Sequence, residues 1–178
     1  MNRTMSKIEY NLMKLEFSLT DFINPYVTKR IEKFNITQGM KVVDYGCGPG
    51  RYTIRIAQLV GKTGEVYAVD INKYAINDVK KKIRKYNLKN IKTFNAINFD
   101  CGIATGVADC IIAIDMFFEI KEPKYFFNEL KRICKKDAKL IIDGGHISLD
   151  ETKKRIKDVN IWNIEEEEKD FLICRIRS

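Results

Sequence analysis

The chain has 178 residues, of which 45% are hydrophobic and 31% are charged, and it contains three prolines. This composition is typical of an ordered globular protein and excludes disordered and fibrous classes. Lys and Arg number 32 against 24 Asp and Glu, so the formal net charge is +8, which favours anionic partners without specifying nucleic acid. We expect one domain over residues 1–178, large enough to fold around its own core.

The sequence shows neither a membrane span nor a metal-binding pattern. No run of about 18 uncharged apolar residues, the length that crosses a bilayer, occurs in it. The first residues, MNRTMSKIEYNLMK, lack the apolar segment of a signal peptide, so we expect a cytoplasmic protein. The five cysteines form no CxxC pair, which argues against a zinc site and a disulfide framework and predicts reduced thiols: Cys47, Cys101, Cys110, Cys134 and Cys174.

The first predicted element is a helical region around Asp21–Phe34, within an N-terminal region of residues 1–38. Asn24-Pro25 marks a turn after which a new helix begins. Aromatic side chains in this part have the spacing of an apolar helix face: Tyr10, Phe17, Phe22 and Tyr26. They indicate either core packing or a helix that lies over a cleft.

From Met40 onward, short β-branched runs alternate with longer helical segments. The predicted strands are 40–45, 65–70, 91–96, 109–115 and 138–143, and the predicted helices between them are 51–60, 73–86 and 122–134. A further helix at 149–159 and two strands at 161–167 and 171–177 follow. The pattern predicts an α/β fold with a doubly wound, mostly parallel seven-stranded sheet and a C-terminal antiparallel hairpin.

The densest charge run, Lys80–Lys85, lies in the predicted helix 73–86. An apolar stripe at helical spacing accompanies it: Ile76, Val79, Ile83 and Tyr86. Because the basic side chains cover the rest of the circumference, we interpret the run as a solvated helix face rather than an RNA-binding patch.

The segment Val42–Gly50, VVDYGCGPG, is the most informative one. A buried strand runs into a turn with glycine at alternate positions, which allows positive φ and a close approach of backbone to a ligand. The spacing is GxGxG, and Arg51 occupies the place of the third glycine in the dinucleotide fingerprint. No Lys-Ser or Lys-Thr pair follows, so a P-loop is excluded.

The second predicted strand ends at Asp70, twenty residues after Gly50. A carboxylate there can accept hydrogen bonds from the two hydroxyls of a ribose, which indicates a ligand that contains adenosine. NAD enzymes use an acid at the same place, so the spacing of the glycine turn has to distinguish NAD from other ligands that contain adenosine.

These residues resemble the class I S-adenosylmethionine-dependent methyltransferases, particularly the small enzymes similar to ubiquinone and menaquinone biosynthesis methyltransferases. The resemblance is carried in order by VVDYGCGPGRYT, GKTGEVYAVDIN, VADCIIAIDMFFEI, FFNELKRICKKDAKLII and the final hairpin. It implies a Rossmann-like fold, S-adenosyl-L-methionine as cofactor and S-adenosylhomocysteine as product. It also implies contacts with the methionine part at Gly46, Gly48 and Gly50, with its ammonium at Asp44, with the ribose at Asp70 and with the adenine face at Ile71. Cys47, inside the turn, is more consistent with packing than with reactivity.

The resemblance further implies a polar residue after the third strand that accepts from the adenine amino group. Asn98 and Asp100 both qualify, and we favour Asp100 for its chemistry, although either residue can simply begin a turn. Asp115 with Met116, Phe117 and Phe118 follows the fourth strand, where parallel sheets bind ligands, so we expect this segment to face the cleft. A histidine that related enzymes carry before the acid of this segment is missing here, since Phe118 precedes Glu119.

His146 is the only histidine and follows the fifth predicted strand. That position makes it a candidate general base. Equally, it can be an exposed residue before a helix start, since Ser148 and Glu151 have the spacing of a capping box.

The reaction expected from these residues is in-line methyl transfer to a small-molecule acceptor. No Asn-Pro-Pro-Tyr or Asp-Pro-Pro-Tyr follows the fourth strand, which disfavours methylation of exocyclic base amines. Alternatives are an RNA methyltransferase, supported by the net charge, a non-catalytic S-adenosylmethionine-binding subunit, and an NAD-linked oxidoreductase, which Arg51 opposes. The sequence indicates neither the acceptor nor an oligomeric state.

Overall fold

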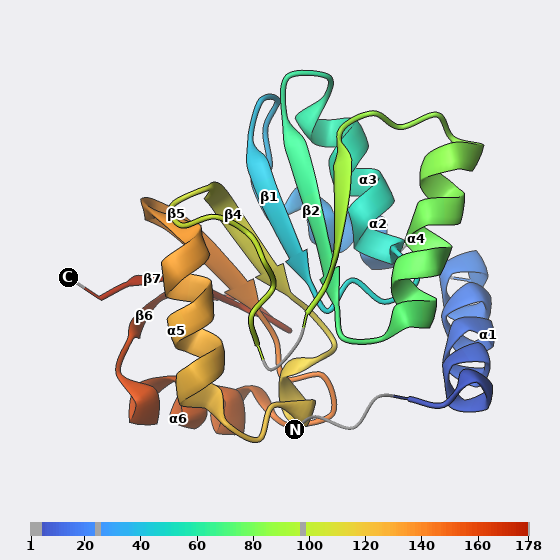
Figure 1. Cartoon of the computed structure of the whole chain (residues 1–178). Coiled ribbons are helices and arrows are strands. Elements are labelled where there is room, and N and C mark those ends of the chain that lie inside the picture. Colours follow the sequence, from blue (N-terminus) through green and yellow to red (C-terminus); the bar gives the residue numbers. More distant parts are fainter. Residues whose placement is uncertain (1–4, 24–25, 97–98, 178) are drawn as a thin grey trace.

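The computed structural model describes residues 5–23, 26–96 and 99–177. Within these residues, seven strands form one sheet in the order β3-β2-β1-β4-β5-β7-β6 (Figure 1). The strands are β1 (Lys41–Tyr45), β2 (Glu65–Asp70), β3 (Ile91–Asn95), β4 (Ala108–Ala113), β5 (Cys134–Ile142), β6 (Trp162–Glu167) and β7 (Leu172–Ile176). The helices are α1 (Lys7–Ile23), α2 (Tyr26–Glu32), α3 (Arg51–Val60), α4 (Lys73–Lys85), α5 (Pro123–Ile133) and α6 (Leu149–Val159), with a short 3₁₀ helix η1 (Phe117–Glu119).

Strands β1 to β5 pair in parallel, and β7 pairs antiparallel with both β5 and β6. The predicted doubly wound sheet with a C-terminal antiparallel hairpin is therefore confirmed. The largest difference in a boundary is that β5 begins at Cys134, directly after α5, instead of at Ala138, and β4 ends at Ala113 instead of Asp115. Cys134 pairs with Ala108, and the polar residues that follow it extend the strand on an exposed stretch.

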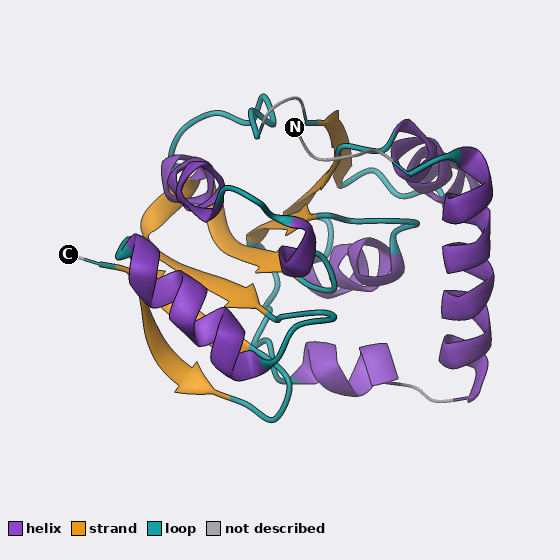
Figure 2. Cartoon of the chain, turned by 90° about the horizontal axis from the view of Figure 1, so that it is seen from below, coloured by secondary structure: helices purple, strands orange, loops and turns teal. Residues whose placement is uncertain are grey.

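Helices cover both faces of the sheet (Figure 2). Successive residues of a strand point to opposite faces, so Val42 belongs to the core beneath α2, α3 and α4, whereas Val43 belongs to the core beneath α5 and α6. Phe126 and Phe127 of α5 are fully buried in the second of these cores. The site is thus built on a sheet that is packed on both sides.

The N-terminal helices differ in extent from the prediction, since α1 already begins at Lys7. It ends at Ile23 and α2 begins at Tyr26, whereas the predicted turn at Asn24-Pro25 lies outside the described residues. Figure 1 places α1 beside α4, near the end where α4 begins. The contact between the two helices includes an ion pair of 2.6 Å between Lys14 Nζ and Asp78 Oδ2.

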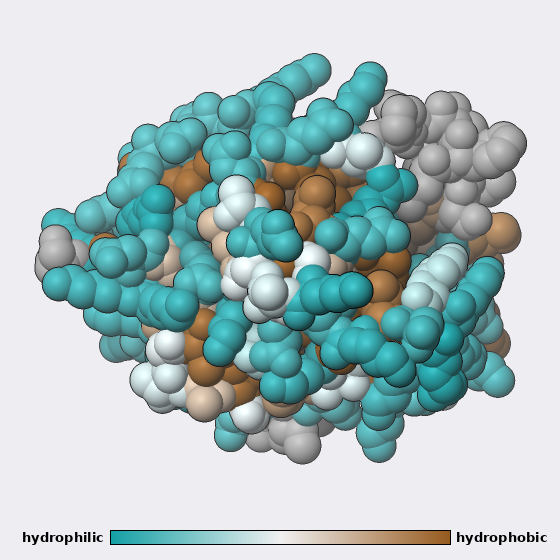
Figure 3. Space-filling model, turned by 90° about the horizontal axis from the view of Figure 1, so that it is seen from above, coloured by the Kyte–Doolittle hydropathy of each residue, from teal (hydrophilic) through white to brown (hydrophobic). Residues whose placement is uncertain are grey.

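The surface is mostly hydrophilic, as expected for a chain in which 31% of the residues are charged. Figure 3 shows the end opposite to that of Figure 2, and hydrophilic side chains cover most of this face. On α4, Ile76 and Val79 are buried while Lys80 and Lys85 are exposed, which confirms the solvated helix face. None of the helices that the structure describes has the length and hydropathy to cross a bilayer. The five cysteines are buried free thiols.

Candidate functional site

The candidate site lies at the point where the strand order of the sheet reverses. β1 is hydrogen-bonded to β2 on one side and to β4 on the other; β3 continues the sheet beyond β2, and β5 continues it beyond β4. In such sheets, ligands bind at the carboxyl ends of the strands beside this switch point. Figure 2 views the molecule from this end.

The turn after β1 needs its glycines for their backbone conformation. Gly46, Gly48 and Gly50 have φ values of 81°, 51° and 82°, in the left-handed region that L side chains rarely adopt. The backbone N–H groups of Gly46 and Cys47 donate to the carbonyl of Val69 at 2.8 and 2.9 Å, which fixes the turn to β2. Gly50 then forms the N-cap of α3.

The surroundings of the three glycines differ. A Cβ atom on Gly46 would lie 2.8 Å from Met116 Cγ, and one on Gly50 would lie 3.1 Å from Val79 Cγ2. At Gly48 a Cβ atom would meet nothing within 4 Å. Gly46 is therefore required by packing within the protein, and Gly50 leaves little room beside Val79, whereas Gly48 borders open space that a ligand can occupy.

Asp70 and the glycine turn form one unit. Asp70 Oδ2 accepts from the N–H of Gly48 at 2.9 Å, and Oδ1 accepts from the N–H of Asn72 at 2.7 Å. Burial raises the pKa of Asp70 above its ordinary value, although these backbone bonds counteract the shift. Each carboxylate oxygen keeps capacity for a further hydrogen bond. Ile71, the next residue, is half-buried against the core on the α5 side.

Asp44 lies beneath the turn and is almost completely buried. Its Oδ2 accepts from Thr53 Oγ1 at 2.5 Å. Burial and the charge of Asp70 raise the pKa of Asp44 to about 7, against the lowering effect of the Thr53 hydroxyl. Burial also raises the pKa of the Cys47 thiol, which favours the packing interpretation of this cysteine over reactivity.

The segment after β4 turns sharply at Asp115. This residue has a φ of 56°, and its N–H donates to Asp143 Oδ1 at 2.8 Å. Its Oδ2 lies 4.0 Å from Arg51 Nη1, so the β4 end reaches the start of α3. The expectation that all four residues of this segment face the cleft is wrong for Phe117, which is fully buried among the aromatic residues of the core.

His146 is exposed after β5 and packs against the β4 segment. Its ring centroid lies 4.5 Å from that of Phe118, edge to face. Glu119 is half-buried, and burial raises its pKa while the nearby His146 lowers it. The charge of Glu119 also contributes to raising the pKa of Asp70. Ser148 caps α6 by accepting from the N–H of Glu151 at 3.1 Å, as predicted.

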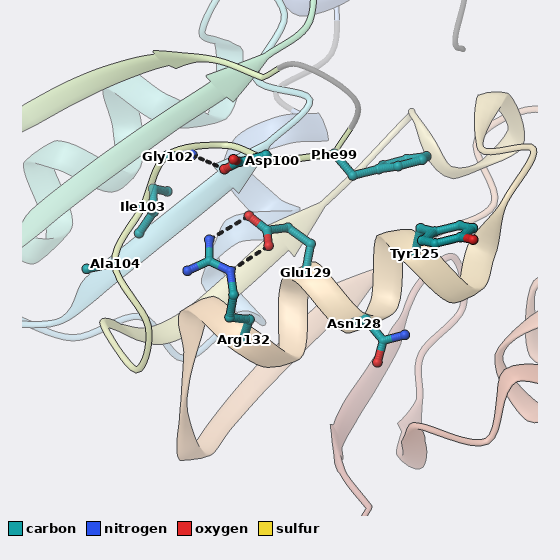
Figure 4. A pocket seen from close by; sticks show the side chains of 9 residues that line it. All are labelled: Phe99, Asp100, Gly102, Ile103, Ala104, Tyr125, Asn128, Glu129 and Arg132. Carbon is teal, nitrogen blue, oxygen red and sulfur yellow. Dashed lines mark hydrogen bonds and ion pairs between the residues drawn. The ribbon is translucent and has the colours of Figure 1, made fainter.

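Asp100 lies in a surface pocket of about 670 Å³ between the loop after β3 and α5 (Figure 4). Its Oδ1 accepts from the N–H of Gly102 at 2.9 Å, so it does stabilise a turn. Opposite it, Glu129 and Arg132 form a double hydrogen bond with both distances at 2.7 Å. Asn98, the alternative, lies outside the described residues, and the adenine contact of either residue stays a prediction.

A comparison with known protein families identifies the family of this chain. Residues 36–171 match the family model described as "Methyltransferase domain". The chain belongs to this family.

Curated relatives match the methyltransferase over shorter stretches. A demethylmenaquinone methyltransferase from a Geobacillus species is 34% identical over 70 residues, which cover 38% of this chain and 30% of the relative. A probable cobalt-precorrin-6B C(15)-methyltransferase (decarboxylating) from Saccharolobus solfataricus is 38% identical over 60 residues, covering 34% of this chain and 30% of the relative. The matched part thus spans about a third of the length of these relatives.

Two solved structures resemble the methyltransferase over most of its length. A SAM dependent methyltransferase from Aquifex aeolicus has a TM-score of 0.79 at 25% identity and covers 85% of this chain and 89% of its own. A putative S-adenosyl-L-methionine-dependent methyltransferase from Methanococcus maripaludis has a TM-score of 0.77 at 19% identity, covering 100% of this chain and 97% of its own, and shows the shared fold.

Three groups at this end of the sheet make contacts that the sequence did not predict, although Tyr10 was noted as part of an apolar helix face and Glu119 as the acid that follows Phe118. Arg30 of α2 is buried and donates to Asp143 Oδ2 at 2.7 Å. Tyr10 of α1 is buried and donates to Asp78 at 3.1 Å, close enough to Asp70 for the carboxylate to affect its pKa. Glu119 is the third. Asp143 carried a visible signal as the last residue of a predicted strand, and Tyr10 as part of an apolar helix face. Arg30 carried none, because its contact with Asp143 joins distant parts of the chain.

Proposed function

We propose that this methyltransferase binds S-adenosyl-L-methionine at the glycine turn and transfers the methyl group by in-line displacement to a small-molecule acceptor, with S-adenosylhomocysteine as product. The observation that carries the proposal is the hydrogen bond between Asp70 and the Gly48 N–H. It joins a carboxylate suited to ribose hydroxyls to a turn that leaves open space at Gly48.

The residues at the site fit this ligand. The open space at Gly48 would accept the methionine part along the turn, and the remaining lone pairs of Asp70 would accept from the ribose hydroxyls. Asp44, ionised, would attract the ammonium group from beneath the turn. The residues proposed to hold the cofactor are Asp44, Gly46, Cys47, Gly48, Gly50, Asp70, Ile71 and Asp115, with Asn98 or Asp100 at the adenine amino group.

When bound, the cofactor supplies an electrophilic methyl group on a sulfonium. The contribution of the chain is alignment, because a nucleophile held in line needs little further assistance. Asp115 and Met116 at the β4 end and His146 at the β5 end border the place for the acceptor. For an acceptor that must lose a proton, His146 is the candidate general base.

We propose that residues 1–178 form one methyltransferase domain, whose N-terminal region 1–38 helps to cover the cleft. The contact of Tyr10 with Asp78 and the position of Phe17, whose ring centroid lies 4.2 Å from the Arg51 guanidinium carbon, support this placement. Small-molecule acceptors are favoured by the names of the curated relatives, which act on demethylmenaquinone and on a cobalt-precorrin.

Thermal unfolding tests the ligand class. S-adenosylhomocysteine at about 100 times its dissociation constant should stabilise the wild-type fold by about 2.7 kcal/mol, whereas NADH should not. Asp70→Asn should remove most of this stabilisation, and Asp109→Asn, at the far end of the sheet, serves as its control. Stabilisation by NADH alone would indicate an oxidoreductase instead.

A labelling experiment tests the acceptor class. The enzyme is incubated with fractionated cell extract and S-adenosyl-L-methionine whose methyl group is radioactive. Label in small metabolites is expected. Label that disappears after ribonuclease treatment would indicate an RNA methyltransferase, and binding of the cofactor without any transfer would indicate a non-catalytic subunit.

A further inference from the structure

The short segment after β4 connects the glycine turn to His146. Met116 lies against the turn, since a Cβ atom on Gly46 would be 2.8 Å from Met116 Cγ and 3.0 Å from its Cβ. Two residues further on, the ring of Phe118 contacts the ring of His146 edge to face, with 4.5 Å between the centroids. The segment therefore carries contacts to both walls between which the acceptor is proposed to lie.

The 3₁₀ helix η1 in this segment has only three residues. The N–H of Glu119 donates to the carbonyl of Met116 at 3.1 Å. The N–H of Ile120 donates to the carbonyl of Phe117, also at 3.1 Å. Met116, at the N-cap, makes no side-chain capping bond. Because a 3₁₀ helix of this length is weak by itself, contacts from other elements are needed to hold it.

Arg155 of α6 makes such contacts at the end of η1. Its Nη1 donates to the carbonyl of Phe117 at 3.2 Å, and its Nη2 donates to the carbonyl of Ile120. The guanidinium carbon lies 4.5 Å from the centroid of the Phe117 ring, which is fully buried. Carbonyl groups at the C-terminal end of a helix carry partial negative charge, so a cation stabilises them.

The guanidinium of Arg155 is committed to this segment. The side chain is half-buried, and burial lowers its pKa although Glu151 raises it. None of the ion pairs in the described part of the chain includes Arg155. An arginine presents several N–H donors in one plane and can bind two carbonyls at once, whereas a lysine presents a single ammonium group. Arg155 therefore joins α6 to η1.

A second arginine holds the other end of the segment. Arg30 of α2 reaches Asp115 through Asp143, which accepts from both. Since α2 and α6 pack on opposite faces of the sheet, the segment is held from both faces. The two carbonyls that Arg155 binds lie on either side of Phe118 in the chain, so this arginine holds the part of the segment that contacts His146.

We propose that Arg155 is a positioning residue for methyl transfer, which keeps Phe118 in contact with His146 by holding the carbonyls on both sides of it. Because Met116 belongs to the same segment, its contact with the glycine turn depends on Arg155 as well. The inference rests on the proposed function, which places the acceptor between the ends of β4 and β5. Arg155 acts through η1 and not by contact with the acceptor.

The first experiment measures the contact between Phe118 and His146 by proton NMR. His146 is the only histidine, so its imidazole C–H protons give one set of signals, which the electrons of the neighbouring Phe118 ring shift. Phe118→Leu removes that ring and provides the reference position. Arg155→Met should move the signals most of the way to this reference. Lys154→Met, at an exposed position of the same helix, should leave them unchanged.

Signals of Arg155→Met at the wild-type position would overturn the proposal. Arg155→Lys keeps the positive charge but holds only one carbonyl at a time, so its signals should lie between those of the wild type and Arg155→Met. Thermal unfolding shows whether each variant is folded. If Arg155→Met does not fold, Arg155→Lys decides alone, because wild-type signals in this variant would equally overturn the proposal.

The second experiment measures single-turnover methyl transfer to the metabolite fraction that takes up label, the acceptor fraction. Arg155→Met should lower the rate about tenfold or more, because the alignment of the reactants is lost, and Arg155→Lys should recover part of it. The affinity for S-adenosylhomocysteine should match that of the wild type, since the hydrogen bond between Asp70 and Gly48 does not involve η1. The Lys154→Met control should match the wild type in both.

An equal loss of rate and of cofactor affinity in Arg155→Met would mean that Arg155 supports the whole site, and it would overturn a specific effect on the acceptor side. A wild-type enzyme that transfers no methyl group would contradict the proposed function itself. The NMR comparison needs no turnover, so it tests the effect of Arg155 on the contact between Phe118 and His146 separately from that function.

Discussion

The carboxylate of Asp143 joins the buried guanidinium of Arg30 to the backbone of Asp115. Oδ2 accepts from Arg30 Nη2 at 2.7 Å, and Oδ1 accepts from the N–H of Asp115 at 2.8 Å. Asp115 has a positive φ, which is strained for a residue with a side chain. Helix α2 therefore helps to hold the turn at the end of β4 through a single acid at the end of β5.

Replacing Arg30 should lower the free energy of unfolding more at high pH than at low pH. Burial raises the pKa of Asp143 above its ordinary value even though Arg30 lowers it, so Arg30→Met should raise this pKa further. An unpaired buried carboxylate then destabilises the fold by about 3–5 kcal/mol at pH 8. Protonation restores part of this stability as the pH falls towards 5.

Urea unfolding of Arg30→Met at pH 5 and pH 8 measures the effect. Arg175→Met serves as a control, because Arg175 forms an exposed ion pair with Glu165 and should cost less than about 1 kcal/mol. Equal destabilisation of Arg30→Met at both pH values would contradict the assigned role of Asp143.

Alanine substitutions should separate the packing role of the glycines from the binding role. Gly48→Ala places a side chain at positive φ in open space and should cost about 1–2 kcal/mol of stability. Gly46→Ala adds a collision with Met116, which should cost about 1–3 kcal/mol more.

Gly106→Ala is the matched control for Gly48→Ala, since Gly106 also has a positive φ and no atom within 4 Å of its Cβ position. Both variants should unfold at similar urea concentrations, but only Gly48→Ala should lose affinity for S-adenosylhomocysteine in calorimetric titration. Equal affinities would mean that the open space at Gly48 does not hold the ligand.

Binding of S-adenosylhomocysteine should strengthen as the pH rises from 6 to 8. The pKa of Asp44 is about 7 in the free protein, and the ionised form attracts the ammonium group, so the affinity should rise by about tenfold over this range. Calorimetric titration across the range measures this rise, and Asp44→Asn should abolish it.

The raised pKa of Asp44 also makes the stability of the free protein depend on pH, but stability falls with rising pH whereas the affinity rises. The folded pKa lies above the ordinary value of 3.8, so stability falls as the pH rises from about 4 to 7. Asp44→Asn should flatten this dependence in urea unfolding. A pH-independent affinity together with a steep stability profile would place the ammonium away from Asp44.

His146→Ala should lower kcat by about 10²-fold or more if His146 abstracts a proton from the acceptor. The affinity for S-adenosylhomocysteine should not change, since His146 contacts Phe118 after the β4 end and not the glycine turn. Single-turnover methyl transfer with the labelled acceptor fraction provides the rate. Unchanged turnover would remove His146 from the reaction and indicate an acceptor that needs no base.

The sequence by itself determined the order of the elements, the mostly parallel sheet, the glycine turn and the acid at the end of β2. These features depend on local patterns, namely a period of two or 3.6 residues and glycine where φ must be positive. The parallel strands then bring Asp44, Asp70 and Asp115 to one edge, because their carboxyl ends coincide.

Only the tertiary structure decided why Gly46 lacks a side chain, which acid holds Arg30, and where the lysines of α4 meet α1. Met116, Asp143 and Lys14 are the residues that settle these points. Each contact joins segments that lie far apart in the chain, and the side chains involved carry no periodic signal. Their partners are fixed by how the helices pack on the two faces of the sheet, a property of the whole fold and not of any local sequence.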